Sequence, residues 1–473
     1  MTDPRPIILW FRRDLRLSDH PALAAACATG RPVVPVFILD EVVSALGAAP
    51  MFRMEAAVSV FAATLASQSS RLILRRGKAL DVLRQLVAET GAADVWWQRL
   101  YDPAAKARDT EVKAALKTDG VEARSFAGHV MFEPWEVQTG AGGFYKVFTP
   151  FWNTVRGRDL PGLLPAPARI TAPVNWPASD DLAAWNMAAA MRRGAAVLAP
   201  YMQVGEAAAR DRLDQFIDRK VAGYVAARDM PGVDGTSGLS ENLTYGEISP
   251  LTCWYAGRRA MQDGKPGAET FLKELVWRDF ATHLVHHTPQ IVDRNWKPEW
   301  DAFPWNTNVL SPEVKAWQQG RTGVPFVDAA MRQMYVTGTM HNRGRMIVAS
   351  YLTKHLMTDW RIGLHWFADC LIDWDPASNA MGWQWAAGSG PDAAPYFRVF
   401  NPVTQLDKFD PRGIYAKTWI AEGQKQPHAT ALAYFDAIPD RWNLSPRSFY
   451  PSPIVGMAEG RQRALNAYAA RVL

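Results

Sequence analysis

The sequence predicts an α/β domain of the Rossmann type with a parallel sheet over residues 1–130, a long connector over residues 131–200, and an all-α domain over residues 201–473. Two patterns predict this division. Short apolar runs alternate with helical patterns up to residue 126, whereas helical periodicity dominates after residue 205. A chain of 473 residues is long enough to build these units without disulfide or metal support.

The N-terminal part reads as strands alternating with helices. Strands are expected at residues 7–11, 33–39, 72–74, 95–97 and 123–126, and helices at 21–28, 53–67, 79–90 and 104–118. Such alternation gives a parallel sheet with helices on both faces. The first strand is followed by Arg-Arg-Asp-Leu-Arg-Leu rather than by a glycine-rich G-x-G-x-x-G turn, so the usual pyrophosphate cradle is missing.

Prolines mark the connector. Five of them fall between residues 160 and 177, where the fixed φ angle and the missing N–H predict extended, irregular backbone. The helical pattern then takes over, and helices are expected at residues 206–225, 268–285, 325–335, 343–354 and 363–371.

Composition excludes several classes of protein. The three cysteines are far apart, which argues against a disulfide framework, a structural zinc site or an iron–sulfur cluster, and fits a reducing compartment. The apolar run at residues 7–11 is too short for a signal peptide, and no apolar stretch is long enough to span a membrane. We therefore expect a bacterial-type cytoplasmic protein. The net charge of +5 excludes neither nucleic acid nor small molecules as partners, and 20 tryptophans are more than packing ordinarily needs.

Four features of the sequence could have a catalytic or binding role, and each also has a purely structural interpretation. The run Thr-Ser-Gly-Leu-Ser at 236–240 could bind phosphate or could cap a helix. His283, His286 and His287 have a spacing that could ligate a metal, but no Glu or Cys completes the set, so no metal site is expected. Asp373 and Asp375 could be an acid pair or could be ion-paired, with Arg278 and Arg345 as candidate partners.

The fourth feature is an aromatic segment at 379–402. It contains Trp383, Trp385, Tyr396 and Phe397 next to Arg398, a mixture that suits stacking on a planar ligand or base and equally suits a core cluster. From the residues alone, the sequence predicts an α/β plus α protein with a planar, polyanionic ligand.

Several long motifs then occur in one order along nearly the whole chain, and with them the chain resembles the DNA photolyase/cryptochrome family. The motifs occupy residues 10–17, 246–250, 274–278, 322–329, 340–346, 382–385 and 392–398. The resemblance implies an N-terminal antenna domain and a C-terminal helical domain that holds FAD in a folded, U-shaped form. It also implies UV-damaged DNA as the partner, a monomer, and no obligate protein partner.

Within the family, the chain is most similar to the enzymes that repair cyclobutane pyrimidine dimers. Glu274, Asn342 and Met346 match those members, whereas (6-4) photolyases place histidines in the 340–346 segment. The competing hypotheses are a cryptochrome-type blue-light receptor, a (6-4) photolyase and a flavoprotein electron carrier. Light sensors often carry a long C-terminal extension, and this chain ends about 70 residues after the last motif.

The resemblance assigns residues to the cofactor. It implies FAD contacts at Tyr224, Thr236, Ser237, Leu239, Ser240, Glu274, Arg278, Asn342, Arg345, Asp373, Asp375 and Asn379. Asp373 and Arg345 would form a charge pair near the isoalloxazine. The amide of Asn379 would lie beside flavin N5 and tune the electronic state of the reduced cofactor.

The resemblance also assigns residues to substrate and to electron transfer. A dimer flipped out of the duplex would stack between Trp277 and Trp385, with Glu274 and Asn342 on its polar edges and Met346 on its apolar side. Candidate phosphate contacts are Arg228, Arg343, Arg398 and Lys408. Light-excited, fully reduced FAD would give the dimer one electron and recover it after the ring splits. A chain of Trp383, Trp360 and Trp305 would reduce oxidised flavin.

Two positions depart from the family pattern, and the antenna stays open. Gly238 stands where the family commonly has arginine, and Thr339 replaces a usual tryptophan. The acidic residue that folate-type members use is missing from the segment 104–105. Methenyltetrahydrofolate in another binding geometry, 8-hydroxy-deazaflavin and an empty antenna site therefore all remain open.

Overall fold

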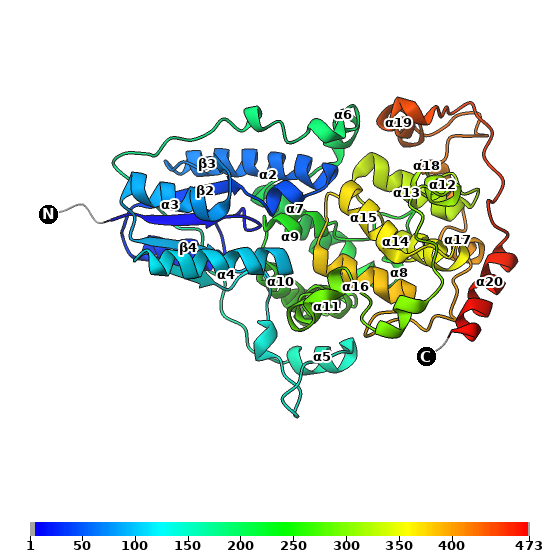
Figure 1. The fold of residues 1–473 in the computed structure, drawn as a ribbon, viewed down its shortest axis with the longest axis horizontal. Helices are drawn as coiled ribbons and strands as arrows, with labels where there is room; N and C mark the ends of the chain where they lie inside the picture. The colour runs from blue at the N-terminus through cyan, green and yellow to red at the C-terminus, as the bar shows by residue number, and fades with distance from the viewer. Residues whose placement is uncertain (1–4, 472–473) are drawn as a thin grey trace.

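A computed structural model describes residues 5–471 and shows a parallel sheet next to a larger helical body (Figure 1). The strands are β1 (Ile7–Phe11), β2 (Val33–Leu39), β3 (Ile73–Arg76), β4 (Asp94–Gln98) and β5 (Glu122–Phe126). All pairings are parallel, and the strand order is β3-β2-β1-β4-β5. The α/β plus all-α prediction is confirmed, and each strand lies within two residues of its predicted bounds.

Alternate residues of β1 face two separate cores, which explains why the strand is apolar throughout. Ile7, Leu9 and Phe11 pack with α1 (Pro21–Ala28) and α2 (Ala48–Ser67). Ile8 and Trp10 pack with α3 (Ala79–Thr90) and α4 (Pro103–Thr118) on the opposite face. A parallel sheet covered on both faces has no solvent side, so polar residues are excluded from its central strands.

The connector contains two α-helices that the sequence did not reveal. Residues 160–173 form neither helix nor strand, in agreement with their prolines. Before them, α5 (Phe148–Val155) packs on the long helix α11 (Ala268–His287) through Phe148 and Phe151. After them, α6 (Gly194–Leu198) lies next to α19 (Ala429–Ala437) (Figure 1). The connector therefore contacts the helical body at two distant places.

The prediction of one helix over residues 206–225 is wrong. The segment forms α7 (Glu206–Gln215), a wide turn at Phe216–Lys220, a tight turn at Val221–Gly223, and α8 (Tyr224–Ala227). At the tight turn the backbone lies close to another segment, since a Cβ on Gly267 would lie 1.9 Å from the carbonyl oxygen of Val221. Backbone meets backbone at this point, and the periodicity of residues 206–225 carries no sign of it.

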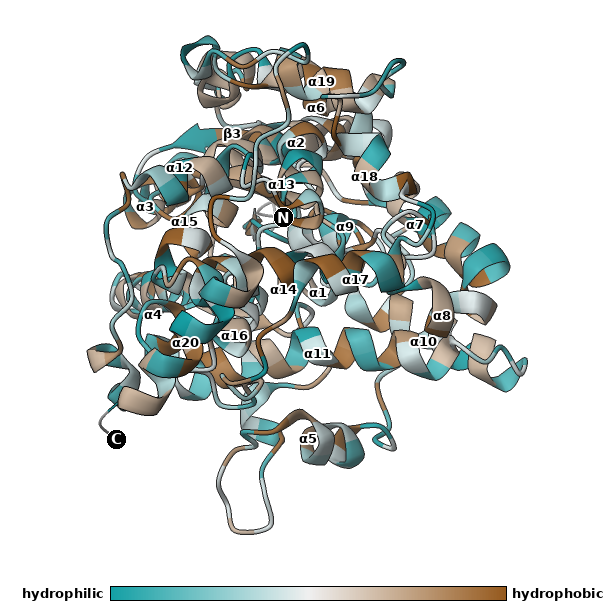
Figure 2. Ribbon diagram, turned by 90° about the vertical axis from the view of Figure 1, so that its right-hand side faces the viewer, coloured by the Kyte–Doolittle hydropathy of each residue, from teal (hydrophilic) through white to brown (hydrophobic). Residues whose placement is uncertain are grey.

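The remaining helices build the body around two main hydrophobic cores. They are α9 (Ser240–Tyr245), α10 (Pro250–Gln262), α12 (Pro312–Gln318), α13 (Pro325–Thr337), α14 (Asn342–Ser350), α15 (Trp360–Cys370), α16 (Pro376–Ala387), α17 (Pro402–Phe409), α18 (Ile414–Trp419) and α20 (Met457–Ala470). Hydrophilic and hydrophobic stretches alternate along α17 in Figure 2, as expected for a helix with one buried face. Helix α11 differs, because every residue from Asp279 to Val285 is buried. Among residues 5–471, no helix is both long enough and apolar enough to cross a membrane.

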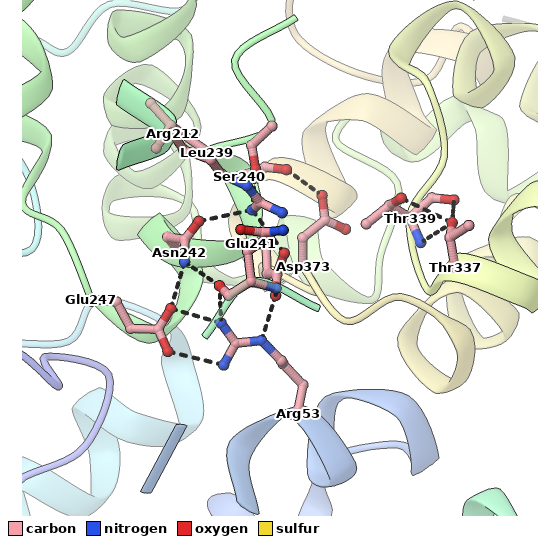
Figure 3. A network of polar contacts seen from close by, with 12 residues as sticks. Arg53, Arg212, Leu239, Ser240, Glu241, Asn242, Glu247, Thr337, Thr339 and Asp373 are labelled. Atoms are coloured by element: carbon pink, nitrogen blue, oxygen red, sulfur yellow. Dashed lines mark hydrogen bonds and ion pairs between the residues drawn. The ribbon is translucent and has the colours of Figure 1, made fainter. Parts of the chain in front are cut away.

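A buried arginine joins the two halves. Arg53 on α2 has no exposed side-chain surface, and it pairs at 2.6 Å with Glu241 of α9 and at 2.6 Å with Glu247 (Figure 3). Burial alone would lower the pKa of Arg53, but Glu247 and Glu241 outweigh it and raise that pKa. Nearby, a Cβ on Gly246 would lie 2.1 Å from the carbonyl oxygen of Arg13. The two halves are therefore held in one geometry by an ion network and by a backbone contact.

We expect Arg53→Met to destabilise the protein by about 3–5 kcal/mol, because the substitution leaves two buried carboxylates without their shared cation. The free energy of unfolding in urea measures the effect. Arg71→Met, at an exposed arginine that follows α2, is the matched control. Equal stability of the Arg53 and Arg71 variants would show that the buried network adds nothing.

Candidate active site

A cavity of about 930 Å³ opens in the helical body between α9, α11, α14 and α16. Most residues that the sequence analysis selected line it. They are Tyr224, Arg228, Thr236, Ser237, Leu239, Ser240, Glu274, Trp277, Arg278, Asn342, Arg345, Met346, Asp373, Asp375, Asn379, Trp383 and Trp385. Residues far apart in the chain thus meet around one space large enough for a dinucleotide.

Three of the predicted phosphate contacts lie away from the cavity wall. Arg343 pairs with Asp229 at 2.7 Å and covers the ring of Phe409. The Lys408 ammonium lies over the same ring, 5.1 Å from its centroid. Arg398 is exposed. These cations belong to the surface outside the cavity, so their assignment to DNA phosphates stays a prediction.

Asp373 is the polar centre of the cavity floor. It accepts two hydrogen bonds from Nη2 of Arg345, at 2.7 and 3.0 Å. It accepts a third from the Ser240 hydroxyl at 2.7 Å (Figure 3). The Arg345 side chain also donates to the backbone oxygen of Met340. The expected Asp373–Arg345 charge pair is present, and both partners are oriented by further hydrogen bonds.

Asp375 has a different partner from the one expected. Arg13, which follows β1, pairs with it at 3.0 Å, whereas Arg278 donates to the backbone oxygen of His129. Burial would raise the pKa of Asp375, but the charges of Arg13 and Arg278 outweigh it and hold the pKa well below its usual range. Asp375 also caps α16 by accepting from the Ser378 N–H. The acid-pair interpretation is therefore wrong, since each carboxylate is paired with an arginine of its own.

Asn379 lies one turn into α16, and its side-chain nitrogen donates to the Asp375 carbonyl at 3.0 Å. This bond fixes which end of the amide is the acceptor. Because Asn379 lines the cavity and is almost fully buried, its amide is presented in one orientation. A fixed amide is what tuning of a neighbouring cofactor nitrogen requires.

Glu274 and Arg228 face each other across the cavity rim. Nη1 of Arg228 donates to Oε1 of Glu274, and about a third of the Glu274 side chain is exposed. Tyr224 lies beside them, and burial together with the charge of Glu274 raises the pKa of Tyr224 to about 12. Arg228 is thus a partner of Glu274 in this structure, and a phosphate contact would have to share or replace that bond.

Each of the two proposed stacking tryptophans has an aromatic ring behind it. Trp277 stacks on Phe148 of α5 with ring centroids 3.6 Å apart and planes 6° apart. Trp385 stacks on Phe400 at 6.4 Å. The sequence analysis missed Phe148, and the only local signal is its place in an aromatic run of the connector. The contact holds the Trp277 indole in one plane.

The three predicted electron-transfer tryptophans lie on packed elements. Trp383 of α16 lies against α15, where a Cβ on Gly363 would meet its ring at 2.0 Å. Trp360, one turn before that glycine, is fully buried and donates from its indole N–H to Asn295. Trp305 donates to the Thr353 carbonyl and stacks on Trp300 at 5.5 Å. Trp360 and Trp305 lie in the core outside the cavity wall.

The loop at 236–240 lines the cavity, and the helix-cap reading of it is wrong. Helix α9 begins at Ser240, and no side chain caps it. Gly238 has a φ of +66°, a conformation that disfavours a side chain. Arg212 of α7 donates to the Gly238 carbonyl at 2.8 Å. The sequence analysis did not select Arg212, because it falls in a helical stretch with no motif.

The histidines of α11 do not form a metal site. His283 accepts from the backbone N–H of Tyr145, and the ring of His287 stacks on Phe144. Among the described residues, 5–471, no group of three or more His, Cys, Asp or Glu is placed to hold a metal ion. These histidines instead fasten the connector to α11.

Comparison with known proteins agrees with this geometry. A family model described as DNA photolyase matches residues 7–170, and one described as the FAD binding domain of DNA photolyase matches residues 271–470. A deoxyribodipyrimidine photo-lyase of Agrobacterium fabrum is 44% identical over 98% of this chain and 98% of its own. The chain belongs to the DNA photolyase family. It is therefore an enzyme of the photolyase type, and its helical body contains that family's FAD-binding domain.

Solved photolyase structures show the same fold. A bacterial class III photolyase from Agrobacterium tumefaciens superposes with a TM-score of 0.92 at 42% identity, over 99% of this chain and 98% of its own. An archaeal photolyase from Sulfolobus tokodaii, with two FAD molecules, superposes with a TM-score of 0.78 at 28% identity, over 98% and 99% of the chains. The cavity fits FAD: its volume is large enough, and a fixed amide and an oriented guanidinium–carboxylate pair line it.

The buried His341 makes stability fall at acid pH. Burial, with Arg343 and Arg345, lowers the pKa of His341 to about 4, against an ordinary value of 6.5. Between these values the unfolded state binds the proton and the folded state does not, so the stability that this group contributes is present above pH 6.5 and is lost as pH falls through 4. We expect His341→Asn to remove about one linked proton from this window.

Asparagine suits this test because His341 caps α14 by accepting from the Arg343 N–H, and asparagine is a good N-cap. Urea unfolding of the holoprotein at several pH values between 4 and 7 measures the linkage. His365→Asn, on the exposed side of α15, is the matched control. A slope in the His341 variant as steep as in the wild type would contradict the assignment.

Proposed function

We propose that this enzyme repairs cyclobutane pyrimidine dimers in DNA by light-driven electron transfer. The proposal rests on the fact that the residues assigned to the substrate and those assigned to the cofactor line the same cavity. Trp277, Trp385 and Glu274 line the same cavity as Asn379 and the Arg345–Asp373 pair. A substrate held by the first group lies next to a cofactor held by the second. The relatives of the chain that are named deoxyribodipyrimidine photo-lyase support the same function.

The side chains divide the work of binding. Trp277, kept in plane by Phe148, offers a flat surface for a flipped base, and Trp385 offers a second. Glu274 hydrogen-bonds the polar edge of the dimer, with Asn342, while Met346 covers its apolar side. Arg228 stays beside Glu274 and donates a hydrogen bond to one oxygen of that carboxylate. Stacking is insensitive to base identity, so the carboxylate and amide provide the selection.

FAD, when bound in its reduced form, supplies the electron that light makes available. Asn379 presents its fixed amide to the flavin edge, and the Arg345–Asp373 pair orients charge beneath the ring system. The buried cavity excludes water from both partners and lowers the local dielectric constant. Trp383, Trp360 and Trp305 form the proposed route by which electrons enter from the surface, since α15 and α16 pack directly on each other.

A second chromophore would need a binding site of its own, outside the cavity of the helical body. In an open α/β sheet, ligands bind at the carboxyl ends of the strands where the strand order reverses. In this chain that place holds Trp10 between the guanidinium groups of Arg12 and Arg108, which pair with Asp109 and Asp40. Only about 60 Å³ remains, far below the roughly 300 Å³ of a small ligand pocket. We propose that neither a folate nor a deazaflavin binds at this place, so a second chromophore would need another site.

The repair reaction is tested with an oligonucleotide that contains a thymine dimer. Blue light on the reduced holoprotein should restore the ultraviolet absorbance of thymine. Trp277→Ala should weaken binding of this DNA about 10- to 100-fold, because one stacking surface is lost. Trp135→Ala, at a partly exposed indole on the connector, is the matched control. No recovery of absorbance by the wild type with reduced FAD present would refute repair and favour a light sensor.

Electron entry is tested at Trp383. We expect Trp383→Phe to abolish reduction of FAD by light and an external donor, because phenylalanine is too hard to oxidise. Repair by the same variant, after chemical reduction of its FAD, should equal that of the wild type. The two rates are followed by the flavin spectrum and by thymine absorbance. Undiminished photoreduction in the variant would show that electrons enter by another route.

A further inference from the structure

We propose that Arg212 of α7 holds the anionic part of the cofactor, in the place that the side chain of residue 238 leaves open. The inference rests on the proposed binding of FAD in the cavity. FAD carries a diphosphate, and the loop Thr-Ser-Gly-Leu-Ser at 236–240 has no charged side chain to meet it. Arg212 lines the cavity next to this loop.

Arg212 is fixed at the loop by three acceptors. Its Nη1 lies 2.8 Å from the Gly238 carbonyl, 2.8 Å from Oε2 of Glu241 and 2.8 Å from Oδ1 of Asn242. Figure 3 shows the side chain reaching from its helix to Glu241 and Asn242, beside Ser240. The guanidinium therefore has one orientation before any ligand arrives, which lowers the entropy cost of binding.

The same geometry leaves donors for a ligand. A guanidinium has five N–H groups, and those of Nη1 alone meet the three acceptors. Within residues 5–471, no acceptor is recorded for Nε or Nη2, and about a fifth of the side chain remains exposed. A planar fork with free donors at a cavity wall is suited to the oxygens of a phosphate.

Glycine at 238 makes room for this arginine. The backbone there has a φ of +66°, and a Cβ would lie 3.6 Å from Nε of Arg212. A long side chain at this position would run along the guanidinium and compete for the same space. The loop lacks the arginine that the family commonly has at position 238, and α7 places Arg212 next to the same position. We therefore infer one phosphate-binding site whose positive charge comes from α7 instead of the loop.

Arg212 is linked to the N-terminal domain through Glu241. The two oxygens of this carboxylate face different arginines: Oε1 accepts from Arg53 of α2, and Oε2 accepts from Arg212. Glu241 is almost fully buried, so neither bond is screened by solvent. Docking of α2 therefore helps to place the guanidinium that meets the cofactor.

Release of FAD from the full-length holoprotein tests the proposal. After dilution, the rise of free-flavin fluorescence gives the release rate, and Arg212→Gln should increase this rate about 10- to 100-fold, the loss expected for a hydrogen bond to a charged group. High salt should speed release from the wild type more than from the variant. Arg210→Gln, two residues earlier on α7 and paired only with Glu206 at the surface, is the matched control.

The outcomes are distinct. Wild-type release rates in Arg212→Gln, or equal acceleration in Arg210→Gln, would overturn the proposal. Arg212→Lys keeps the positive charge but loses the planar guanidinium, so this variant should release FAD about 3- to 10-fold faster than the wild type. If the glutamine variant does not fold, the lysine variant provides the test. An unchanged release rate in the lysine variant would also overturn the proposal. A wild-type protein that retains no FAD would refute the proposed function itself.

Discussion

The buried pairing of Arg53 with Glu241 and Glu247 is the constraint on which the cavity depends. Two carboxylates of the helical body share one guanidinium from the sheet domain, and none of the three has appreciable exposed surface. Burying such an ion pair costs desolvation free energy. Removing one partner costs more, because the charge that remains is buried and is not solvated by water. The network therefore fixes where α9 begins, and with it the loop and the serine that face the ligand.

A second junction follows the same logic on the other side of the cavity. Arg13 leaves the end of β1 and pairs with Asp375, the residue that caps α16. Helix α16 carries Asn379, Trp383 and Trp385, so its first turn sets the position of three groups that we assign to chemistry. The strand-to-helix contact is thus part of the site. The N-terminal domain thus helps to position the helix that carries these groups.

Much of the fold follows from the sequence, because local patterns determine it. Strands buried on both faces must be apolar throughout, and they were predicted within two residues. The end of α7 at Gln215 could not be predicted, because the helical periodicity of residues 206–225 continues through it. The same holds in the site. Sequence motifs predicted Glu274 and Asp373 as site residues. Phe148 and Arg212 were not predicted, because their contacts with Trp277 and Gly238 produce no motif or periodic pattern in the sequence.

The tryptophans show how hydrogen bonding can give direction to the proposed electron route. An indole that has lost an electron becomes a stronger N–H donor, so an acceptor on that N–H stabilises the charged form. Trp360 has the Asn295 oxygen and Trp305 has the Thr353 carbonyl, whereas the buried N–H of Trp383 has no acceptor in the described part of the chain. Positive charge is therefore more stable on the outer two indoles than on the one at the cavity. Electrons drawn from the surface would move toward the cavity and be slow to return.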